Sequence, residues 1–494
     1  MIDITKPKER ELRVLLVNPP HKYKGQALGF NVYFPLSLLY VAAPIKELCK
    51  VEIFDCLVED FEANEEDGFV TYGTPIEKVR KAITKFQPDI CGISIPFSSQ
   101  SENGLRIAKV CREIDPNICV VLGGPHPSVR YEKLLENDQC DYCVVGEGEV
   151  TFKEFVEKFS TGGNLEKIEG VASKKEGKVS CVKRTPVDNL DDLPMPAYDL
   201  LNIKTYLEDP NLYKSRSAIP TKSISVITSR GCPFNCVFCS IKLHMGKKFR
   251  YHSPENVLRH LKYCSEELGI NNFHFEDDNI SFNPDRFEKI LDLIIEEKLD
   301  IQWDTPNGIR ADSLNYRIVE KIKKSGCAGV QLAIESGNQK VLDTIVKKDT
   351  ALEKVLEIVV FCHELDINMC AFYIMGFPGE TMDDMNDTVS LAIRLFDEYK
   401  VVPIMLFATP LYGTELYDVA MEHGIISDDI ADEDFLTSTA YYGEPLISTK
   451  DFSKEDLKML AKDFETRINE RSNGNSLRKI LNDKTSFFEN LQKA

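Results

Sequence analysis

Short apolar runs alternate with helix-like segments along the first third of the chain. Between the runs, apolar residues recur three and four positions apart, which is typical of amphipathic helices. The runs themselves are uninterrupted and flanked by turn-forming residues, as in buried strands. They predict five βα units of an open, Rossmann-like parallel sheet, with strands at residues 12–17, 51–54, 90–95, 119–122 and 142–145.

Small or turn-forming residues follow four of these predicted strands. The loops are "NPP" at 18–20, "SIPFSS" at 94–99, "LGGPHPS" at 122–128 and "GEGE" at 146–149. In open α/β sheets, ligands bind beyond the carboxyl ends of the strands. Glycine and proline also simply turn the chain, but four such loops at one sheet edge favour a ligand site.

The alternating pattern stops near residue 160 and resumes near residue 222. "KKEGKVS" predicts a short hairpin, and the acidic, proline-punctuated "VDNLDDLPMPAYDLL" is typical of a connector. Helices are expected at 284–297 and 381–399, and a polar, helix-prone extension begins near residue 415. Six apolar runs predict the strands of a partial barrel, namely "SISVITS", "NNFHFED", "IQWDTPN", "GVQLAIE", "NMCAFYIMG" and "VPIMLFATP".

The composition narrows the possible partners. The 494 residues include 60 Lys and Arg against 79 Asp and Glu, a net charge of −19 that repels nucleic-acid backbones. No stretch approaches the roughly 18 apolar residues that a membrane-spanning helix needs. We therefore expect a cytoplasmic protein with no nucleic-acid partner and no membrane span. Most of the 15 cysteines, Cys327 among them, are expected to be reduced and to serve in packing.

Three cysteines are the exception, because they lie within one short loop. Cys232, Cys236 and Cys239 follow the first predicted strand of the second domain in "SRGCPFNCVFCS", where a barrel places its active site. Structural zinc normally takes four ligands, and His244 is the only nearby candidate for the fourth. Three thiolates instead suit a 4Fe–4S cluster with one iron left open for a ligand.

The spacing Cys-x3-Cys-x2-Cys after the first barrel strand resembles the radical SAM superfamily. "HFEDDN", "AIESG" and "YIMGFPGE" fall where that superfamily places its other motifs, at the ends of the second, fourth and fifth strands. The resemblance implies that S-adenosylmethionine (SAM) binds the open iron and that its reductive cleavage gives a 5′-deoxyadenosyl radical. It also implies an electron donor such as flavodoxin or ferredoxin.

The first domain resembles the cobalamin-binding domain of one large radical SAM subfamily, through "VVLGGPHPSV", "VVGEGE" and "LDDLPMPAYDLL". The Asp-x-His-x-x-Gly motif that supplies a lower axial histidine in other cobalamin proteins is absent, since "NPPHKYKG" has no Asp two residues before His21. We therefore expect base-off cobalamin without a histidine ligand, with His126 left open as an alternative.

The resemblance assigns candidate residues to each cofactor. The cluster ligands are Cys232, Cys236 and Cys239. The SAM candidates are Phe238, Glu276, Asp277, Asp278, Arg310, Glu335, Ser336, Gly376, Pro378, Gly379 and Glu380. Trp303, Asp304 and Asn307 are candidate contacts of SAM or substrate, or else barrel packing. The cobalamin candidates are Ser94, Gly123, Gly124, His126, Gly146 and Glu147, whose glycines allow close backbone approach.

The expected fold class is therefore α/β, and the chain divides into four segments. A Rossmann-like, flavodoxin-like cobalamin-binding domain spans 1–185, a linker 186–220, a partial (β/α)6 TIM barrel with the radical SAM core 221–415, and a helical C-terminal extension 416–494. His244 and His252, in the loop after the cluster, are expected to stabilise that loop or to be exposed, and not to be catalytic. Ser253 and Pro254 are expected to start a helix as N-cap and first residue.

Three functions remain open at this point. The leading hypothesis is a methyltransferase that acts on an unactivated carbon or a phosphinate of a small-molecule, lipid or peptide substrate. A radical oxidative cyclase or rearrangement enzyme, similar to the anaerobic magnesium-protoporphyrin monomethyl ester cyclase, would have the same architecture. A noncatalytic cobalamin or redox sensor is the third, and the motifs "HFEDDN" and "GFPGE" disfavour it because a sensor needs no SAM pocket.

Overall fold

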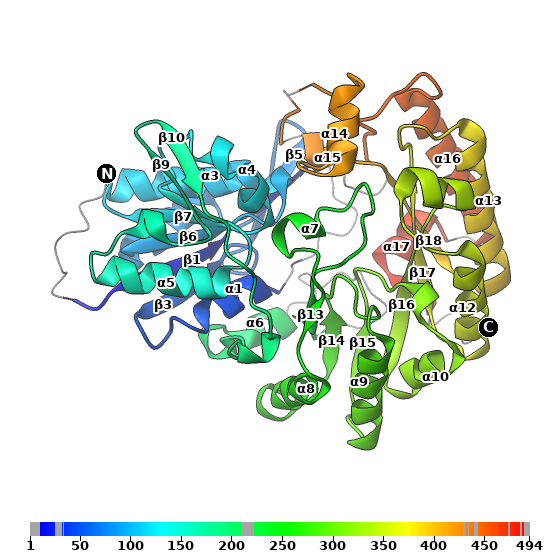
Figure 1. Cartoon of the computed structure of the whole chain (residues 1–494), viewed down its shortest axis with the longest axis horizontal. Helices are drawn as coiled ribbons and strands as arrows, with labels where there is room; N and C mark the ends of the chain where they lie inside the picture. The colour runs from blue at the N-terminus through cyan, green and yellow to red at the C-terminus, as the bar shows by residue number, and fades with distance from the viewer. Residues whose placement is uncertain are drawn as a thin grey trace.

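The computed structural model describes residues 10–24, 32, 34–208, 219, 222–427, 430–432, 434–438, 443–472, 475–484 and 487–488. Part of the expected linker therefore lies outside the described residues. Two parallel sheets with their helices stand side by side in Figure 1. None of the described helices combines the length and apolarity that a membrane crossing requires.

The first domain is built on a seven-stranded sheet in the order β10-β9-β8-β7-β6-β1-β3. Its five parallel strands match the five predicted runs and follow the flavodoxin-like order. The predicted hairpin is β9 and β10, which extends the sheet edge antiparallel to β8. The strands are β1 (Arg13–Asn18), β3 (Lys50–Asp55), β6 (Ile90–Ser94), β7 (Cys119–Gly123), β8 (Tyr142–Val144), β9 (Val171–Lys175) and β10 (Lys178–Cys181).

Amphipathic helices cover both faces of this sheet. Apolar side chains of α2 and α3 pack on one face with Leu15 and Val17, and those of α5 pack on the other with Val14 and Leu16. The alternation along β1 follows from the period of two in a strand. The helices are α1 (Leu36–Ala42), α2 (Ile76–Phe86), α3 (Ser101–Ile114), α4 (Pro125–Leu134) and α5 (Gly148–Ser160).

A second, three-stranded antiparallel sheet was not predicted. It consists of β2 (His21–Lys24), β5 (Phe69–Gly73) and β4 (Glu62–Glu66). The five residues of β4 are all exposed, so no apolar pattern marks the strand. The turn between β4 and β5 is Asp67-Gly68, both with positive φ, which is a strong hairpin signal that periodicity alone does not detect.

The second domain contains the six predicted strands as an open parallel sheet in sequence order, which is the expected partial barrel. Ser253 and Asn283 cap the helices α8 and α9 through their side chains, with Pro at the start of each, as predicted for Ser253. The strands are β11 (Ser223–Val226), β14 (Asn272–Phe275), β15 (Gln302–Asp304), β16 (Cys327–Glu335), β17 (Met369–Met375) and β18 (Val402–Phe407).

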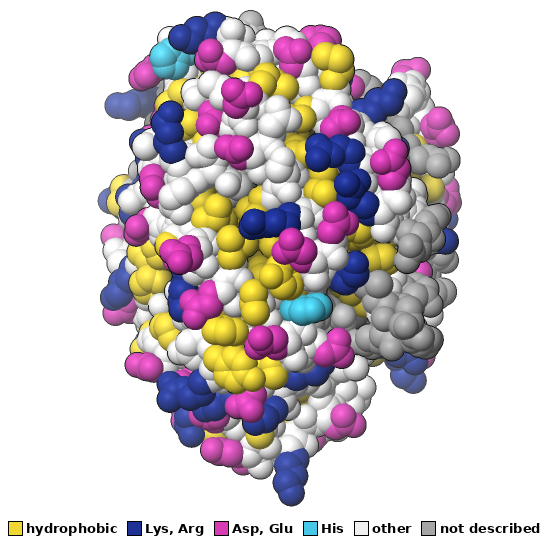
Figure 2. Space-filling view, turned by 90° about the vertical axis from the view of Figure 1, so that its right-hand side faces the viewer, with side chains coloured by type: hydrophobic (Ala, Val, Ile, Leu, Met, Phe, Trp, Pro, Cys, Tyr) yellow, Lys and Arg dark blue, Asp and Glu magenta, His cyan; other side chains and the backbone are white. Residues whose placement is uncertain are grey.

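Helices enclose this barrel and continue into the C-terminal extension. Figure 2 shows the face of the outer helices, where Lys and Arg are interspersed with Asp and Glu. The helices are α6 (Ile203–Glu208), α7 (Ile241–His244), α8 (Pro254–Leu268), α9 (Pro284–Glu296), α10 (Tyr316–Lys324), α11 (Gln339–Val341), α12 (Leu352–Glu364), α13 (Met382–Tyr399), α14 (Glu415–Glu422), α15 (Asp434–Ser438), α16 (Lys454–Arg471) and α17 (Leu477–Asn482).

Residues of the first domain join the apolar core of the barrel, in addition to the two cores on the faces of their own sheet. Phe34 and Tyr40, from the first domain, belong to the same buried cluster as the barrel strands. Phe34 packs against Tyr198 and Tyr206 of the connector, and the Tyr206 hydroxyl donates to Asp55 Oδ2 at the end of β3 (2.7 Å). Connector and domains are therefore packed as one body around this junction.

Candidate functional site

The cysteine loop leaves β11 at the mouth of the barrel. It begins with a short antiparallel pair of β12 (Ser229–Arg230) and β13 (Arg250–Tyr251). Gly231 has φ +80°, and a Cβ there would lie 2.5 Å from the Lys248 carbonyl oxygen, so the loop needs glycine at this position. Cys232, Cys236 and Cys239 are all partly exposed and carry free thiols.

The three thiols suit a cluster better than a single ion. Burial raises the pKa of Cys236 and raises that of Cys239 to about 12, and the thiols lie close enough to perturb one another. Within the described residues, no three His, Cys, Asp or Glu side chains converge as ligands of one metal ion. A 4Fe–4S cubane does not require such convergence, because each cysteine binds a different iron.

Asn279, the last residue of the "HFEDDN" motif, contacts one of these cysteines. Its side-chain Nδ2 donates to Cys232 Sγ (3.6 Å). Its Oδ1 is buried and finds no hydrogen-bond partner among the described residues. The Asn279 amide therefore donates to the Cys232 sulfur and has a buried acceptor oxygen beside it.

The carboxylates of that motif hold the start of the cysteine loop. Asp277 is buried and accepts from the Thr228 amide (3.1 Å) and from the Thr228 and Ser229 hydroxyls (2.7 and 2.5 Å). Asp278 accepts from the Gly231 amide (3.0 Å). Burial raises the pKa of Asp277 and raises that of Asp278 to about 6. Glu276 accepts from Ser225 (3.2 Å), and the contact of all three with SAM stays a prediction.

The end of β16 is fixed by a buried ion pair. Glu335, which has a positive φ of 68°, accepts from Lys348 Nζ (2.9 Å), and both side chains are buried. Lys348 lies close enough to Cys236 to favour its thiolate. Ser336 hydrogen-bonds Thr388 of α13 (3.1 Å). These residues lie beside the cysteine loop, and the predicted contacts of Glu335 and Ser336 with SAM stay a prediction.

Arg310 also lies beside the cysteine loop. Its guanidinium donates to the carbonyls of Lys348 (2.9 Å) and Asp349 (2.6 Å) and to Asp312. It lies 3.6 Å from the ring centroid of Phe234 in the cysteine loop. These contacts fasten the loop that carries Arg310 to residues 348–349 and to the cysteine loop, and the contact of Arg310 with SAM stays a prediction.

The loop after β17 carries a buried carboxyl group. Glu380 Oε2 accepts from the Gly376 amide (2.8 Å) and the Phe377 amide (2.7 Å), while Oε1 is buried and has no hydrogen-bond partner in the described part of the chain. Burial raises the pKa of Glu380 to about 8. Gly376 and Gly379 both have positive φ. The ring of Phe238 lies 6.0 Å from that of Phe377 and closes this loop against the cysteines.

Trp303 proves to be barrel packing. Its side chain is fully buried against Phe275 and Phe287, and its Nε1 donates to Ser325. A tryptophan enclosed by core residues cannot contact SAM or substrate, so that candidate role is wrong. Neighbouring Asp304 accepts a hydrogen bond from His274 Nδ1 (2.7 Å), within the same barrel interior.

The predicted cobalamin residues gather at one edge of the Rossmann-like sheet. Ser94, Gly123 and Gly146 end or follow β6, β7 and β8. Gly124 has φ +112°, and a Cβ there would lie 2.9 Å from the Ile95 carbonyl oxygen. An ideal Cβ on Gly146 would have His244, from the cysteine-loop helix α7, as its nearest contact. Gly124 is therefore required by the close approach of the Ile95 backbone, and the contact of these loops with cobalamin stays a prediction.

His126 lies at that edge with both ring nitrogens facing protein groups. Nδ1 hydrogen-bonds Ser98 (2.9 Å), and Nε2 lies 3.7 Å from Asp432 of the C-terminal extension. Burial lowers the pKa of His126 to about 4. Whether cobalamin binds without a histidine ligand, or with His126, stays a prediction. His21, in β2, has a buried Nε2 for which the described residues provide no partner.

Glu147 has a partner that its motif did not reveal. Its carboxylate accepts from Arg250 (2.5 and 3.0 Å) and lies 3.7 Å from Arg230, which also pairs with Glu149 (2.6 Å). All four charged side chains are buried. This interdomain clamp joins the loop after β8 to the residues on either side of the cysteine loop. The predicted contact of Glu147 with cobalamin stays a prediction.

The clamp keeps its charges by mutual pairing. Burial alone would raise the pKa of Glu149, but the adjacent Arg230 outweighs this and lowers it below its usual range. Arg230 in turn has its pKa raised by the two carboxylates, and its guanidinium lies over the ring of Tyr40. The helix α7 of the cysteine loop also packs on α4 of the first domain. The clamp and this helix contact thus hold the glycine-loop edge of the first sheet against the cysteine loop of the barrel.

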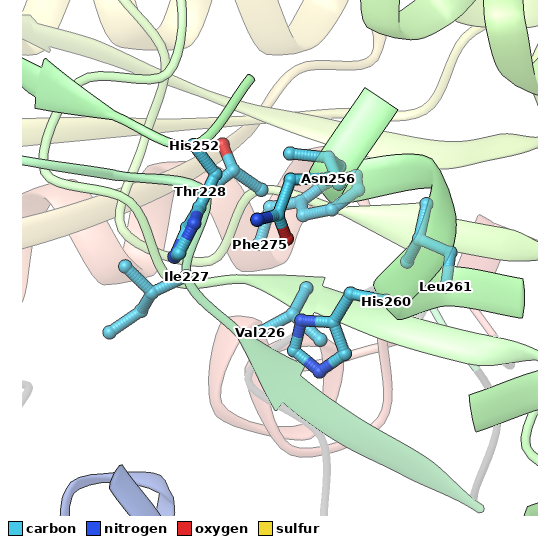
Figure 3. Close-up of a pocket in the computed structure, with 9 residues that line it drawn as sticks. Val226, Ile227, Thr228, His252, Asn256, His260, Leu261 and Phe275 are labelled. Atoms are coloured by element: carbon cyan, nitrogen blue, oxygen red, sulfur yellow. The ribbon is translucent and has the colours of Figure 1, made fainter. Parts of the chain in front are cut away.

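A separate pocket lies between the C-terminal end of β11 and α8. His252, Thr228 and Asn256 lie together at it in Figure 3, with His260 further along α8. His252 Nδ1 contacts Asp191 (3.2 Å), and His260 Nε2 hydrogen-bonds the Tyr198 hydroxyl (2.8 Å). Both histidines fasten the connector to the barrel, as expected for His252, and neither belongs to the cysteine site.

The comparisons with known proteins agree with this geometry. The family model described as "Radical SAM superfamily" matches residues 226–392, and the "B12 binding domain" model matches 30–156. An uncharacterized methyltransferase of Pyrococcus horikoshii is 34% identical over 84% of each chain. The cytidylyl-2-hydroxyethylphosphonate methyltransferase of Streptomyces wedmorensis is 27% identical over 86% of this chain and 85% of that one.

A solved structure shares the whole architecture. The radical S-adenosylmethionine methyltransferase TsrM from Kitasatospora setae, with cobalamin and a [4Fe-4S] cluster bound, superposes with a TM-score of 0.68. The match covers 98% of this chain and 99% of that chain at 16% identity. The superposition shows that the two folds are alike, and at such low identity it shows the fold alone.

Substituting one member of the interdomain clamp should destabilise the protein. Glu147→Gln leaves Arg250 buried beside a neutral group, which we expect to cost about 3 kcal/mol of unfolding free energy. Glu154→Gln on α5 removes a carboxylate from partly exposed pairs with Lys158 and Arg184 and should cost less than about 1 kcal/mol. Urea denaturation of both variants checks this, and equal losses would show that the clamp adds no special stability.

Removing the donor to Cys232 should lower the reduction potential of the cluster. The Asn279 amide favours the more negative reduced cluster, so Asn279→Ala should shift the midpoint by roughly −50 mV, the equivalent of about one hydrogen bond. A redox titration followed by electron paramagnetic resonance measures it. Asn272→Ala, at the opposite end of β14, is the control; an unchanged potential in Asn279→Ala would rule out this role.

Glu380 should make stability depend on pH. Its folded pKa of about 8 exceeds the reference value of 4.5, so its contribution is fully present below pH 4.5 and is lost as the pH rises through 8. Relative to Glu380→Gln, the wild-type chain should lose up to about 5 kcal/mol of unfolding free energy over that window. Urea midpoints of the cofactor-free chains at several pH values test this, and parallel profiles would contradict it.

Proposed function

Because this chain belongs to the radical SAM enzymes that carry a B12-binding domain, we propose that it transfers a methyl group to an unactivated carbon, or to a phosphinate phosphorus, of its substrate. Both curated relatives named above are methyltransferases, and both match the chain across its two domains. The cofactors of such an enzyme are a 4Fe–4S cluster, SAM and cobalamin.

We assign the cofactors to residues at the glycine-loop edge of the first sheet and at the mouth of the barrel. Residues 1–185 form the cobalamin domain, 186–220 the linker, 221–415 the SAM barrel and 416–494 the extension. Cys232, Cys236 and Cys239 hold the cluster. The loops after β14, β16 and β17 hold SAM through Glu276 to Asp278, Glu335, Ser336 and residues 376–380, and the glycine loops after β7 and β8 hold cobalamin.

When bound, the cluster and SAM supply a 5′-deoxyadenosyl radical, and cobalamin supplies the methyl group. The protein's own residues hold and orient the cofactors, and they exclude water from them. Asp277 and Asp278 fix the start of the cysteine loop through Thr228, Ser229 and Gly231. Phe238 and Phe377 form an apolar wall beside the loop after β17, which keeps water from a reactive radical.

The interdomain clamp is the observation that carries this proposal. Glu147 follows Gly146 in the predicted cobalamin loop, and its partner Arg230 lies two residues before Cys232. Methyl transfer requires both cofactors to reach one substrate, so their sites must share a cavity. A noncatalytic sensor would need neither the buried clamp nor the SAM loops.

The substrate is a small molecule in this proposal, and lipids and peptides are the wider class. The electron donor is a separate redox protein such as flavodoxin or ferredoxin. A radical cyclase would use the same cofactors and is distinguished by its products.

The test is the fate of SAM during turnover. A methyltransferase consumes SAM in two ways, so S-adenosylhomocysteine and 5′-deoxyadenosine should form in about a one-to-one ratio, and methyl-labelled SAM should pass its label to the product. Mass spectrometry of the reconstituted enzyme with candidate substrates measures both. Product formed without label transfer or coupled S-adenosylhomocysteine would identify a cyclase or rearrangement enzyme instead.

A further inference from the structure

Four aromatic side chains form a continuous patch beside the cysteine loop. The ring of Phe282 lies 5.9 Å from that of Phe234 and 5.0 Å from that of Phe249, which in turn lies 5.7 Å from that of Tyr251. Phe282 is 37% exposed and Tyr251 41% exposed. Exposed aromatic side chains in contact with one another are unusual on a soluble surface and mark interaction sites.

The aromatic patch includes one residue of the cysteine loop and lies next to it. Phe234 lies between Cys232 and Cys236 in sequence. Phe249 and Tyr251 belong to the segment that pairs with β12, just before Cys232. Phe282 follows Asn279, whose amide contacts the Cys232 sulfur, by three residues. A protein resting on the patch would thus lie directly over the cluster loop.

Two buried arginine side chains pack against rings of the patch and hold them in place. The Arg310 guanidinium lies 3.6 Å from the Phe234 ring centroid, and the Arg286 guanidinium lies 5.1 Å from that of Tyr251. Both arginines are buried and hydrogen-bonded to backbone carbonyls. Their contacts hold the rings in place without burying the outer faces of Phe282 and Tyr251. Pre-ordered aromatic surfaces of this kind suit the centre of a protein interface.

Positive charges border the patch on a chain that is otherwise acidic. Lys247 and Lys248 are exposed in the loop immediately before Phe249. Lys248 pairs with Asp188, but both side chains are at least 70% exposed, so the pair is weak and readily exchanged. The whole chain carries a net charge of −19. An acidic partner would be repelled from most of this surface and attracted to this border.

We propose that the aromatic patch, with Lys247 and Lys248, is the docking surface for a small acidic redox protein that reduces the cluster. This inference rests on the proposed function, which requires the cluster to be reduced for every SAM cleaved. One electron passes from the docked donor to the cluster, so the donor is oxidised by one electron and the cluster is reduced by one. Direct contact over the cysteine loop gives the electron its shortest protein path.

The experiment compares two reductants in the fully reconstituted enzyme. We expect Phe282→Ser combined with Tyr251→Ser to raise the KM for reduced flavodoxin at least tenfold in 5′-deoxyadenosine formation. The rate with dithionite, which needs no docking surface, should stay within twofold of wild type. Tyr316→Ser removes an aromatic residue that is 45% exposed on the helix α10 and should change neither rate.

A second variant tests the charge. Lys247→Glu combined with Lys248→Glu should weaken flavodoxin binding at low salt by at least tenfold and lose this effect at high salt. Binding of oxidised flavodoxin, followed by calorimetry, measures it without turnover.

The outcomes separate the possible errors. Unchanged flavodoxin binding and KM in both variants would overturn the docking proposal, as would an equal loss with flavodoxin and dithionite or a rise in the KM for substrate alone. Wild-type enzyme that cleaves no SAM with dithionite would instead refute the proposed function. Even then, the calorimetric comparison of wild type with the two variants decides whether the surface binds the donor.

Discussion

The arrangement of this molecule depends on four charges buried between its domains. Glu147 and Glu149 follow the last parallel strand of the first domain, and Arg230 and Arg250 belong to the two short strands beside the cysteine loop. Removing one charge from water costs several kcal/mol, so such a group is tolerated only when partners surround it. The domains must therefore dock in the one register that pairs all four.

This requirement explains why the neighbouring contacts are so specific. Phe34 and Tyr40 enter the core of the barrel, and Tyr206 reaches back from the connector to Asp55. Apolar contact alone would tolerate small rotations of one domain on the other, because it lacks direction. The ion pairs and hydrogen bonds select one orientation, in which the glycine loops of the sheet edge face the cysteine loop of the barrel.

The sequence was enough to predict the two sheets, the hairpin and the cysteine loop, because apolar runs and cysteine spacing are local signals. The sheet formed by β2, β5 and β4 was missed, since the exposed residues of β4 have no apolar alternation. Trp303 could be placed only by tertiary packing, because an aromatic residue near a strand end suits a core as well as a site. The clamp was missed because Glu147 and Arg250 are 103 residues apart.

The central claim is that the protein holds the cluster and cobalamin at one fixed separation across the clamped interface. Pulsed electron paramagnetic resonance of the enzyme with cob(II)alamin and the reduced cluster measures the dipolar coupling between their unpaired spins. A rigid junction predicts a single, narrow distribution of distances, which broadens when Arg250→Ala opens the clamp. A broad distribution in the wild-type enzyme, or one that the Arg250 variant leaves unchanged, would contradict this account.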